Sequence, residues 1–433
     1  MRKRCQTELH RETTEKVKGE VPRMAESGKY LLALLRGVLR ATDGGGADVG
    51  ESDGMPTAAE GTECDAAGVG AHGAEPGIPG DAWESLYTLC REQNLIGFLH
   101  RAAAGDANVP EAVRAKIQRQ YLLSVAQQVQ QDYCREQIFS ALAAAGIRYL
   151  PLKGVDLRAV YPATDLRFSC DIDFFYDAPR RDEVNAILTG MGFSRERGDA
   201  HNDSFMLGAV HVEPHFDLTD SGKRHKAYYA HVWDRLVSDD GIRYRFTDED
   251  FYVFVLLHTY KHFLNGGSGA RSVMDAWLWK QAHPDMDEQI LASAYDALGI
   301  TRFALQLERL GRVWFGGERG DGDMGLLTGF LLSGGAYGTK QQAASMDAAK
   351  AGRKRGARFR YLWHRMFLPY KLLRLQYPVL RRAPVLLPFF WVVRWFRLLF
   401  SRDRDYLKST LHAAGKMTKE ETEEVRRVWE IIR

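Results

Sequence analysis

Residues 167–175, RFSCDIDFF, place two acidic side chains two residues apart in a segment that otherwise has the apolar pattern of a buried strand. Side chains alternate between the faces of a strand, so Asp171 and Asp173 share one face, while Ile172 and Phe174 share the other. Neighbouring carboxylates repel and lose hydration on burial, unless a cation lies between them or one of them is protonated. A divalent cation is the simplest remedy, and carboxylate oxygens suit Mg²⁺ or Mn²⁺. The alternative to a metal site is that Asp171 and Asp173 lie at the end of a strand and both face water.

The apolar pattern changes its period along the chain, and this change predicts the fold class. A helical stripe with a step of four residues ends at Gly146; it consists of Val113, Ile117, Tyr121, Val125 and Val129 and continues to Phe139 and Leu142. Residues 147–152 and 170–176 have the pattern of strands, and a helix is expected from Asp177 to Met191. We therefore expect an α+β fold, in which helices precede and follow a small mixed sheet that carries the acids.

A later strand, residues 210–218, carries a second polar face. Its polar positions, which alternate with apolar ones, are His211, Glu213, His215 and Asp217. A strand rises about 3.3 Å per residue, so the carboxylates of Glu213 and Asp217 start some 13 Å apart and cannot both reach one metal cluster. Glu213 lies in the middle of the strand and is the predicted third ligand. Asp217 lies near Thr219 and Gly222, where a turn-stabilising role is expected.

These features together resemble the polymerase-β-type nucleotidyltransferase superfamily. The resemblance is carried by Lys153-Gly154 after a strand, Arg167 and Ser169 before the Asp-x-Asp pair, and an acid on a later strand. Within the superfamily, the sequence is most similar to the bacterial family of uncharacterised nucleotidyltransferases, often found with polysaccharide-biosynthesis functions. The string RFSCDIDF also resembles the nucleotidyltransferase toxins of abortive-infection systems. The superfamily turn is usually Gly-Gly or Gly-Ser, whereas Val155 follows the glycine here.

The resemblance implies a metal-dependent transfer of an NMP group from a nucleoside triphosphate, such as ATP, to an acceptor hydroxyl of a sugar, protein or RNA. Asp171, Asp173 and Glu213 would hold Mg²⁺ or Mn²⁺, and Glu213 could also take the proton of the acceptor hydroxyl. Gly154 would let the backbone approach the triphosphate. A catalytically silent module that binds nucleotides or serves polysaccharide biosynthesis is the alternative function.

Three further residues are assigned to the nucleotide site by the same resemblance. Lys153 and Arg167 would neutralise the charge of the triphosphate, and Ser169 would lie beside them. Each has a structural alternative. Lys153 could be a solvated surface lysine, Arg167 could pair with Asp165 or Asp171, and Ser169 could cap the turn into the strand.

A second cluster lies in HTYKHFLNGGSGARSVMDAW, residues 258–277. His258 and His262 are one helical turn apart, and a glycine-rich turn leads from them to Arg271 and Asp275. The similar family has a like arrangement, which implies that His258, His262 and Arg271 form a wall of the nucleotide or acceptor pocket. A zinc site is one alternative, although Thr259 stands where a zincin has its glutamate; packing of two histidines between helices is the other.

The C-terminal third is strongly basic. Between Asp347 and Asp403 the sequence has no acidic residue, while basic residues alternate with Trp363, Tyr370, Trp391 and Trp395. Contact with a membrane surface, binding of an RNA acceptor and packing against the catalytic domain are the alternatives for this tail. No apolar run reaches the roughly 18 residues of a membrane-spanning helix. Five cysteines without paired spacing indicate a reducing compartment, so we expect a cytoplasmic protein, peripheral at the inner face of the membrane if the tail binds lipid.

Composition and periodicity also predict how the chain is divided. The expected regions are an N-terminal extension with a short helix and a flexible linker (1–80), a helical region (81–146), the nucleotidyltransferase core (147–247), a second helical region (248–335), a basic linker (336–357) and a basic aromatic helical tail (358–433).

Overall fold

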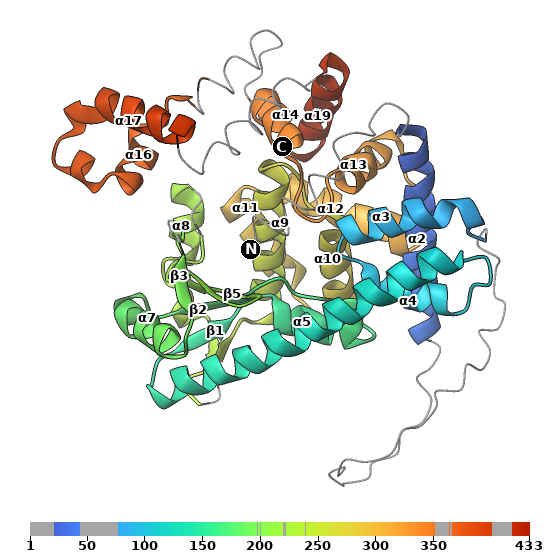
Figure 1. The fold of residues 1–433 in the computed structure, drawn as a ribbon, viewed down its shortest axis with the longest axis horizontal. Helices are drawn as coiled ribbons and strands as arrows, with labels where there is room; N and C mark the ends of the chain where they lie inside the picture. Colours follow the sequence, from blue (N-terminus) through green and yellow to red (C-terminus); the bar gives the residue numbers. More distant parts are fainter. Residues whose placement is uncertain are drawn as a thin grey trace.

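A computed structural model describes residues 21–43, 77–196, 198–199, 201–219, 222–238, 240–350, 363, 366–400 and 418–433. Most of the flexible linker expected between residues 43 and 80 lies outside these ranges, as do residues 351–357 of the expected basic linker. The protein is a mostly helical α+β structure with a five-stranded mixed sheet, so the predicted fold class is confirmed (Figure 1).

The sheet has the order β1-β2-β5-β4-β3. Its strands are β1 (Tyr149–Pro151), β2 (Ile172–Tyr176), β3 (Ser194–Glu196), β4 (Ser204–Leu207) and β5 (Val210–His215). Only β2 and β5 pair in parallel, and the other neighbours are antiparallel. The parallel pair is central to the site, because it joins the strand of the Asp-x-Asp motif directly to the strand that carries Glu213. A two-stranded sheet, β6 (Val237–Ser238) and β7 (Tyr244–Arg245), lies beside β1.

One face of the sheet is covered by α5 (Glu111–Ala144) and α7 (Arg181–Gly190). The apolar core beneath them combines Ile172, Phe174 and Tyr176 of β2 with Val210 and Val212 of β5, and with Ile138, Leu142, Val184 and Leu188 of the two helices. The alternation read from the sequence therefore has a physical cause, because every second residue of β2 enters this core. The intervening residues of β2 and β5, including the acids, belong to the opposite face.

The buried stripe of α5 differs from the sequence prediction. Val113 and Ile117 are buried as expected, but Val129 is 63% exposed, and Gln128 and Gln131 are buried in its place. A step of four residues advances about 400° around a helix of 3.6 residues per turn, so a strict four-residue stripe drifts away from the packed face. The buried face of α5 returns to apolar residues at Ile138 and Leu142, and its polar middle lies beside the Asp-x-Asp motif.

A larger helical core lies beside the sheet and includes both ends of the described chain. It contains α2 (Val21–Asp43), α3 (Trp83–Glu92), α4 (Ile96–Ala104), α9 (Asp248–Leu264), α10 (Ala270–Ala282), α11 (Glu288–Leu298), α12 (Thr301–Phe315), α13 (Gly322–Ser333), α14 (Lys340–Lys350) and α19 (Lys419–Ile432). The remaining short elements of this part of the chain are η1 (Gly80–Ala82), α6 (Gly154–Ala159), η2 (Thr164–Leu166), η3 (Ala178–Arg180), α8 (Lys223–Tyr229) and η4 (Val232–Asp234).

Two segments expected to be peripheral belong to this core. Leu31 and Leu35 of α2 are fully buried within it. Residues 340–350 of the expected basic linker form helix α14, in which Ala344 and Met346 are fully buried. The composition of these segments did not reveal this packing, because polar and alanine-rich flanks dominate it, whereas a few apolar residues at helical spacing determine the packing.

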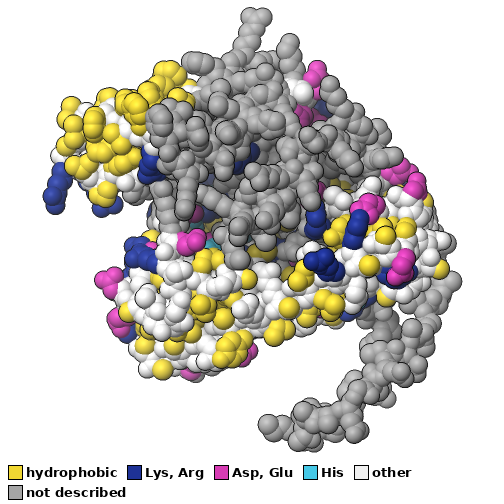
Figure 2. Space-filling view, viewed as in Figure 1, with side chains coloured by type: hydrophobic (Ala, Val, Ile, Leu, Met, Phe, Trp, Pro, Cys, Tyr) yellow, Lys and Arg dark blue, Asp and Glu magenta, His cyan; other side chains and the backbone are white. Residues whose placement is uncertain are grey.

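The basic aromatic tail contains α16 (Tyr370–Gln376), η5 (Pro378–Arg381), η6 (Pro384–Leu386) and α17 (Leu387–Phe400). Figure 1 shows α16 and α17 together at one end of the molecule, and Figure 2 shows apolar side chains gathered there with Lys and Arg beside them. The most exposed of these apolar residues are Val385 (83%), Phe389 (60%) and Phe396 (59%). Within the part of the chain that the structure describes, no helix has both the length and the apolar character that crossing a membrane requires.

Candidate functional site

The register of β2 and β5 brings together the acids that the sequence places 40 residues apart. Asp173 is the direct partner of Glu213 across the parallel pair. Two overlapping groups have ligand atoms within 4.8 Å of one another: Asp171 with His211 and Glu213, and Asp173 with Glu213 and His215. Glu213 belongs to both groups. Three carboxylates and two imidazoles thus converge on one face of the sheet, a donor set that could hold divalent cations.

Asp173 lies between a lysine ammonium and an imidazole ring. One of its oxygens lies 3.4 Å from the Lys153 ammonium, and the other lies 3.3 Å from Nε2 of His215. Burial by itself would raise the pKa of Asp173, but the charge of Lys153 and the contact with His215 outweigh it and hold this pKa well below its usual range. Asp173 is therefore an ionised carboxylate, as metal binding requires.

Glu213 is held by polar neighbours on its own sheet. The amide of Asn202 donates to one carboxylate oxygen at 3.1 Å, and Nε2 of His211 lies 3.5 Å from the other. His211 also contacts the Ser204 hydroxyl at 2.9 Å. These contacts fix the direction of the carboxylate. The sequence pattern had shown that His211 and His215 share the polar face with Glu213, but only Glu213 was assigned to the site.

Asp217 lies beyond the end of β5. Its carboxylate pairs with Lys226 at 2.7 Å and accepts a hydrogen bond from the backbone N–H of Thr219 at 3.2 Å. It is absent from both groups of converging ligands among the described residues. This placement agrees with a turn-stabilising residue rather than a metal ligand.

Lys153 occupies the turn between β1 and α6 with an unusual backbone conformation, φ 48° and ψ −59°. Its ammonium lies between Asp173 and Nε2 of His258, which is 3.1 Å away. A non-glycine residue at positive φ is strained, and such strain is often stored at functional sites. Lys153 is thus directed at the acids and is not a solvated surface lysine. The next residue, Gly154, lies close to Ser169, because a Cβ there would lie 3.1 Å from the Ser169 hydroxyl and would require a small shift.

The rings of His258 and His262 on α9 meet edge to face, with their centroids 4.3 Å apart. Burial, followed by the charge of Lys153, lowers the pKa of His258 well below its usual value, so its ring is neutral. Neither histidine belongs to a group of three or more potential metal ligands among the described residues. The contact with Lys153 places His258 at the edge of the acid cluster.

Arg167 and Arg271 each donate a hydrogen bond to a backbone carbonyl near the acid cluster. Arg167 is 5% exposed and forms a bidentate ion pair with Asp275, at 2.8 and 3.1 Å, so its carboxylate partner is not one of the two considered as the structural alternative, Asp165 and Asp171. Another nitrogen of Arg167 lies 3.3 Å from the carbonyl oxygen of Gly154. Arg271 donates to the carbonyl oxygen of Phe168 at 2.8 Å. The pairing was missed because Asp275 lies 108 residues away on α10, and sequence spacing does not reveal such contacts.

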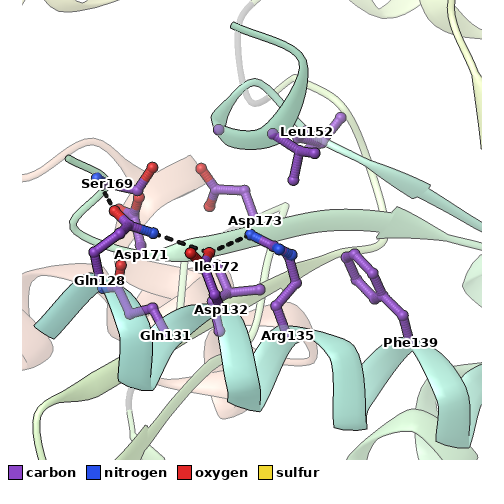
Figure 3. Close-up of a pocket in the computed structure, with 12 residues that line it drawn as sticks. Gln128, Gln131, Asp132, Arg135, Phe139, Leu152, Ser169, Asp171, Ile172 and Asp173 are labelled. Carbon is purple, nitrogen blue, oxygen red and sulfur yellow. Dashed lines mark hydrogen bonds and ion pairs between the residues drawn. The ribbon is translucent and has the colours of Figure 1, made fainter. Parts of the chain in front are cut away.

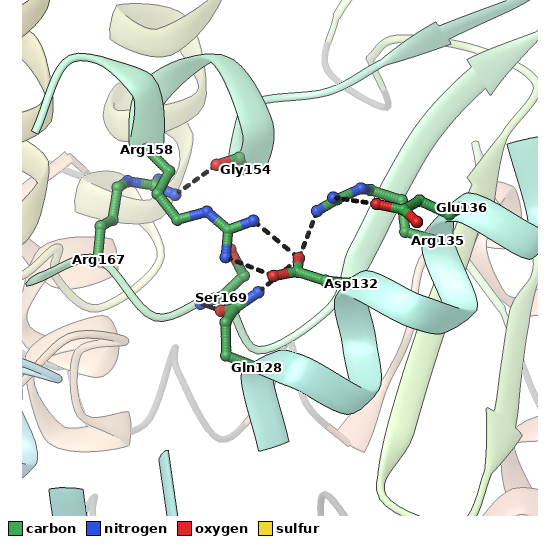
Figure 4. A network of polar contacts seen from close by, with 8 residues as sticks. All are labelled: Gln128, Asp132, Arg135, Glu136, Gly154, Arg158, Arg167 and Ser169. Atoms are coloured by element: carbon green, nitrogen blue, oxygen red, sulfur yellow. Dashed lines mark hydrogen bonds and ion pairs between the residues drawn. The ribbon is translucent and has the colours of Figure 1, made fainter. Parts of the chain in front are cut away.

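A polar network from α5 borders the same site and was not anticipated (Figure 4). Asp132 accepts hydrogen bonds from two nitrogens of Arg158 at 2.7 and 3.0 Å and from Arg135 at 2.5 Å. Gln128 accepts a hydrogen bond from the backbone N–H of Ser169 at 2.8 Å, which ties α5 to the start of β2. Ser169 is thus held through its backbone N–H, and its hydroxyl lies close to the place that a Cβ of residue 154 would occupy. The interruption of the apolar stripe by glutamines was the only sequence signal for this network.

Comparison with known proteins gives a family match. Residues 79–316, more than half of the chain, match the model of a family described as uncharacterised nucleotidyltransferase. No curated protein matches the sequence. Among solved structures, the chain is similar to the solution structure of the antibiotic-resistance factor ANT(2'')-Ia, with 12% sequence identity and a TM-score of 0.31, over 42% of this chain and 98% of that one. This structural similarity is too low to support a conclusion about the present chain.

Proposed function

The chain belongs to the uncharacterised nucleotidyltransferase family, and from this premise we propose that it is a metal-dependent nucleotidyltransferase that moves an NMP group from a nucleoside triphosphate to an acceptor hydroxyl. The observation that carries the proposal is the convergence of Asp171, Asp173 and Glu213 on one face of a parallel strand pair. The likeness of the RFSCDIDF string to polymerase-β-type enzymes and abortive-infection toxins supports the same reaction class. The acceptor is a hydroxyl of a sugar, a protein or RNA.

The three carboxylates are the proposed ligands of Mg²⁺ or Mn²⁺. These cations, when bound, would neutralise the triphosphate and the charge that develops on its oxygens. The residues fit such a site, because oxygen donors predominate and Asp173 is ionised. Glu213 faces Asp173 across the strand pair, so it can bind at the same place and accept the proton of the attacking hydroxyl.

Lys153 is the proposed phosphate ligand. Its ammonium lies 3.4 Å from Asp173, and an incoming triphosphate can attract it away from the carboxylate. His258 is neutral, so it supports Lys153 without adding charge. In this arrangement Gly154 and Ser169 shape the turn that faces the phosphates. Arg167 and Arg271 position the backbone around this turn, while His262 packs against His258 as part of the pocket wall.

The test is incubation of the purified protein with radiolabelled ATP, Mg²⁺ and a cell extract. Transfer of label to a macromolecule or glycan in the wild type, and its loss in Asp173→Asn, is the expected result. Nuclease and protease treatment of the labelled product then identifies the acceptor class. Nucleotide binding without any transfer, with each of the four common nucleoside triphosphates, would favour a silent nucleotide-binding module instead.

The tail supports a proposal about location, namely that this enzyme works at an anionic membrane surface. Phe389, Val392 and Phe396 of α17 lie at positions i, i+3 and i+7 and are between 41% and 60% exposed. The neighbouring Arg381 and Arg382 are exposed as well. Exposed apolar clusters with basic neighbours favour the interface of a membrane that contains anionic lipids. Binding of RNA, or packing on the catalytic unit, is the competing outcome of the test described in the Discussion.

A further inference from the structure

A small recess lies between the polar middle of α5 and the start of β2, directly beside the acid cluster (Figure 3). Gln131 and Arg135 come from α5, while Asp171 and Asp173 come from the strand segment. Phe139, one turn further along α5, supplies an aromatic wall. The space has a volume of about 20 Å³, which is enough for one water-sized group.

Gln131 has no internal partner for its amide. The residue is 1% exposed, and neither its amide nitrogen nor its amide oxygen has a hydrogen-bond partner among the described residues. Buried polar atoms are nearly always paired, because an unpaired one loses its hydration without compensation. The neighbouring polar residues of α5 are already engaged, since Gln128 binds Ser169 and Asp132 binds Arg135 and Arg158. The unpaired amide is therefore the part of the recess that a ligand would satisfy.

The chemistry of the recess defines what this ligand offers. A glutamine amide presents one acceptor and one donor side by side, so its complement is a pair of adjacent groups of which one donates and the other accepts. Two neighbouring hydroxyls of a sugar ring meet this requirement. One hydroxyl matches the size of the enclosed space, and the second would lie in its mouth, where Arg135 is accessible as a further donor.

We propose that the recess is a vicinal-diol subsite, in which the amide of Gln131 binds two adjacent hydroxyls of a sugar ring. The sugar is either the ribose of the nucleoside triphosphate or a glycan acceptor. The ribose alternative rests on the proposed nucleotidyltransferase function, whereas the sugar-acceptor alternative requires only that the recess binds a carbohydrate. Because the recess borders Asp171 and Asp173, a sugar held there lies beside the reacting phosphate.

The experiment compares Gln131→Leu with the wild type, and with Gln127→Leu as a matched control at an exposed position of the same helix. Leucine removes an unpaired amide, so the thermal midpoint of Gln131→Leu without ligand should be equal to or higher than that of the wild type. Binding of ATP and of 2'-deoxy-ATP is measured by calorimetry with Mg²⁺ present. Binding of D-mannose, D-galactose and D-glucose at millimolar concentration is measured by saturation-transfer NMR.

For a ribose subsite, the wild type should bind ATP about tenfold more tightly than 2'-deoxy-ATP, and Gln131→Leu should lose this preference while Gln127→Leu keeps it. For a glycan subsite, the two nucleotides bind equally, but the NMR signal of at least one sugar disappears only in Gln131→Leu. Unchanged binding of every probe in Gln131→Leu, or a lowered thermal midpoint that reveals a structural water network, overturns the proposal. If Asp173→Asn loses transfer but Gln131→Leu binds every probe like the wild type, the proposed function stands and only the subsite proposal fails.

Discussion

Asp173 and Glu213 are register partners on adjacent parallel strands, so their carboxylates meet although 39 residues lie between them in the chain. An antiparallel arrangement of the same two segments would require a different connection, because parallel strands need a long crossover. Here the crossover contains α7, β3 and β4. The sheet therefore fixes the positions of Asp173 and Glu213, whereas Asp171 lies in the bend immediately before β2.

This relationship predicts distinct effects for the three acids. Asp173→Asn and Glu213→Gln should each reduce nucleotidyl transfer by at least about a hundredfold, because each removes charge from the proposed site of the metal and the phosphates. Asp217→Asn should leave the rate within about threefold, since its partners are Lys226 and the Thr219 N–H. Initial rates at saturating ATP and Mg²⁺, with circular dichroism to verify folding, make the comparison. Wild-type turnover in Glu213→Gln would remove it from the metal site.

The buried ion pair between Arg167 and Asp275 predicts a large stability effect. Asp275→Asn should lower the free energy of unfolding by about 3–5 kcal/mol, because it leaves the buried Arg167 guanidinium without its counter-charge. Asp165→Asn, which weakens a partly exposed pair with Arg101, is the matched control and should cost less than about 1 kcal/mol. Chemical denaturation of both variants tests the difference. Equal, small losses in the two variants would show that Arg167 finds another partner.

The sequence predicted the strand of the Asp-x-Asp motif, the polar face of β5 and the α+β class, because each depends on local alternation of apolar and polar residues. The strand of Glu213 was expected beside the two aspartates, but the parallel direction and the register of β2 and β5 were not predicted, and this register decides which acid faces which. The sequence also missed the partner of Arg167 and the polar network of α5. These contacts join segments that are distant in the chain, and a single sequence contains no signal for their pairing.

The N-terminal helix shows a different limit of sequence reading. The composition of residues 1–80 predicts that their removal leaves a soluble catalytic unit, but Leu31 and Leu35 of α2 are fully buried in the main core. We now expect Leu35→Ala to cost about 2–5 kcal/mol, because a buried leucine leaves a cavity when it is truncated. Lys29→Ala, at an exposed position of the same helix, should be nearly neutral. Thermal unfolding of the two variants decides whether α2 is an integral element of the core. Equal midpoints would indicate that residues 1–80 can be removed without loss of the fold.

His258 predicts part of the pH dependence of stability. Its pKa is lowered in the folded protein, so below the ordinary histidine pKa of about 6.5 the unfolded chain binds a proton that the folded protein does not. Stability should therefore fall as the pH drops below about 6.5, by up to roughly 1.4 kcal/mol per pH unit for this group. In His258→Asn, the loss between pH 7.5 and 5.5 should be smaller by about 1 kcal/mol.

The control for this measurement is His231→Asn, because the side chain of His231 is 87% exposed. Its pH profile should match that of the wild type. Denaturation is carried out in metal-free buffer, so that protonation of the metal ligands does not contribute through lost metal binding. An unchanged profile in His258→Asn would mean that its ring is protonated in the folded state, and the contact with Lys153 would then need another explanation.

The exposed apolar face of α17 predicts binding to anionic vesicles. Wild-type protein should sediment with vesicles that contain phosphatidylglycerol, and it should bind less at high salt, because the arginines of the tail are screened. The double variant Phe389→Gln, Phe396→Gln should bind at least about tenfold more weakly, since each phenylalanine contributes more than about 1 kcal/mol when its ring leaves water. Leu122→Gln, which changes a 54% exposed leucine on α5, is the control and should bind like the wild type. If the wild type does not bind these vesicles but binds RNA, the tail is an RNA-binding segment. If it binds neither, the tail packs within the protein.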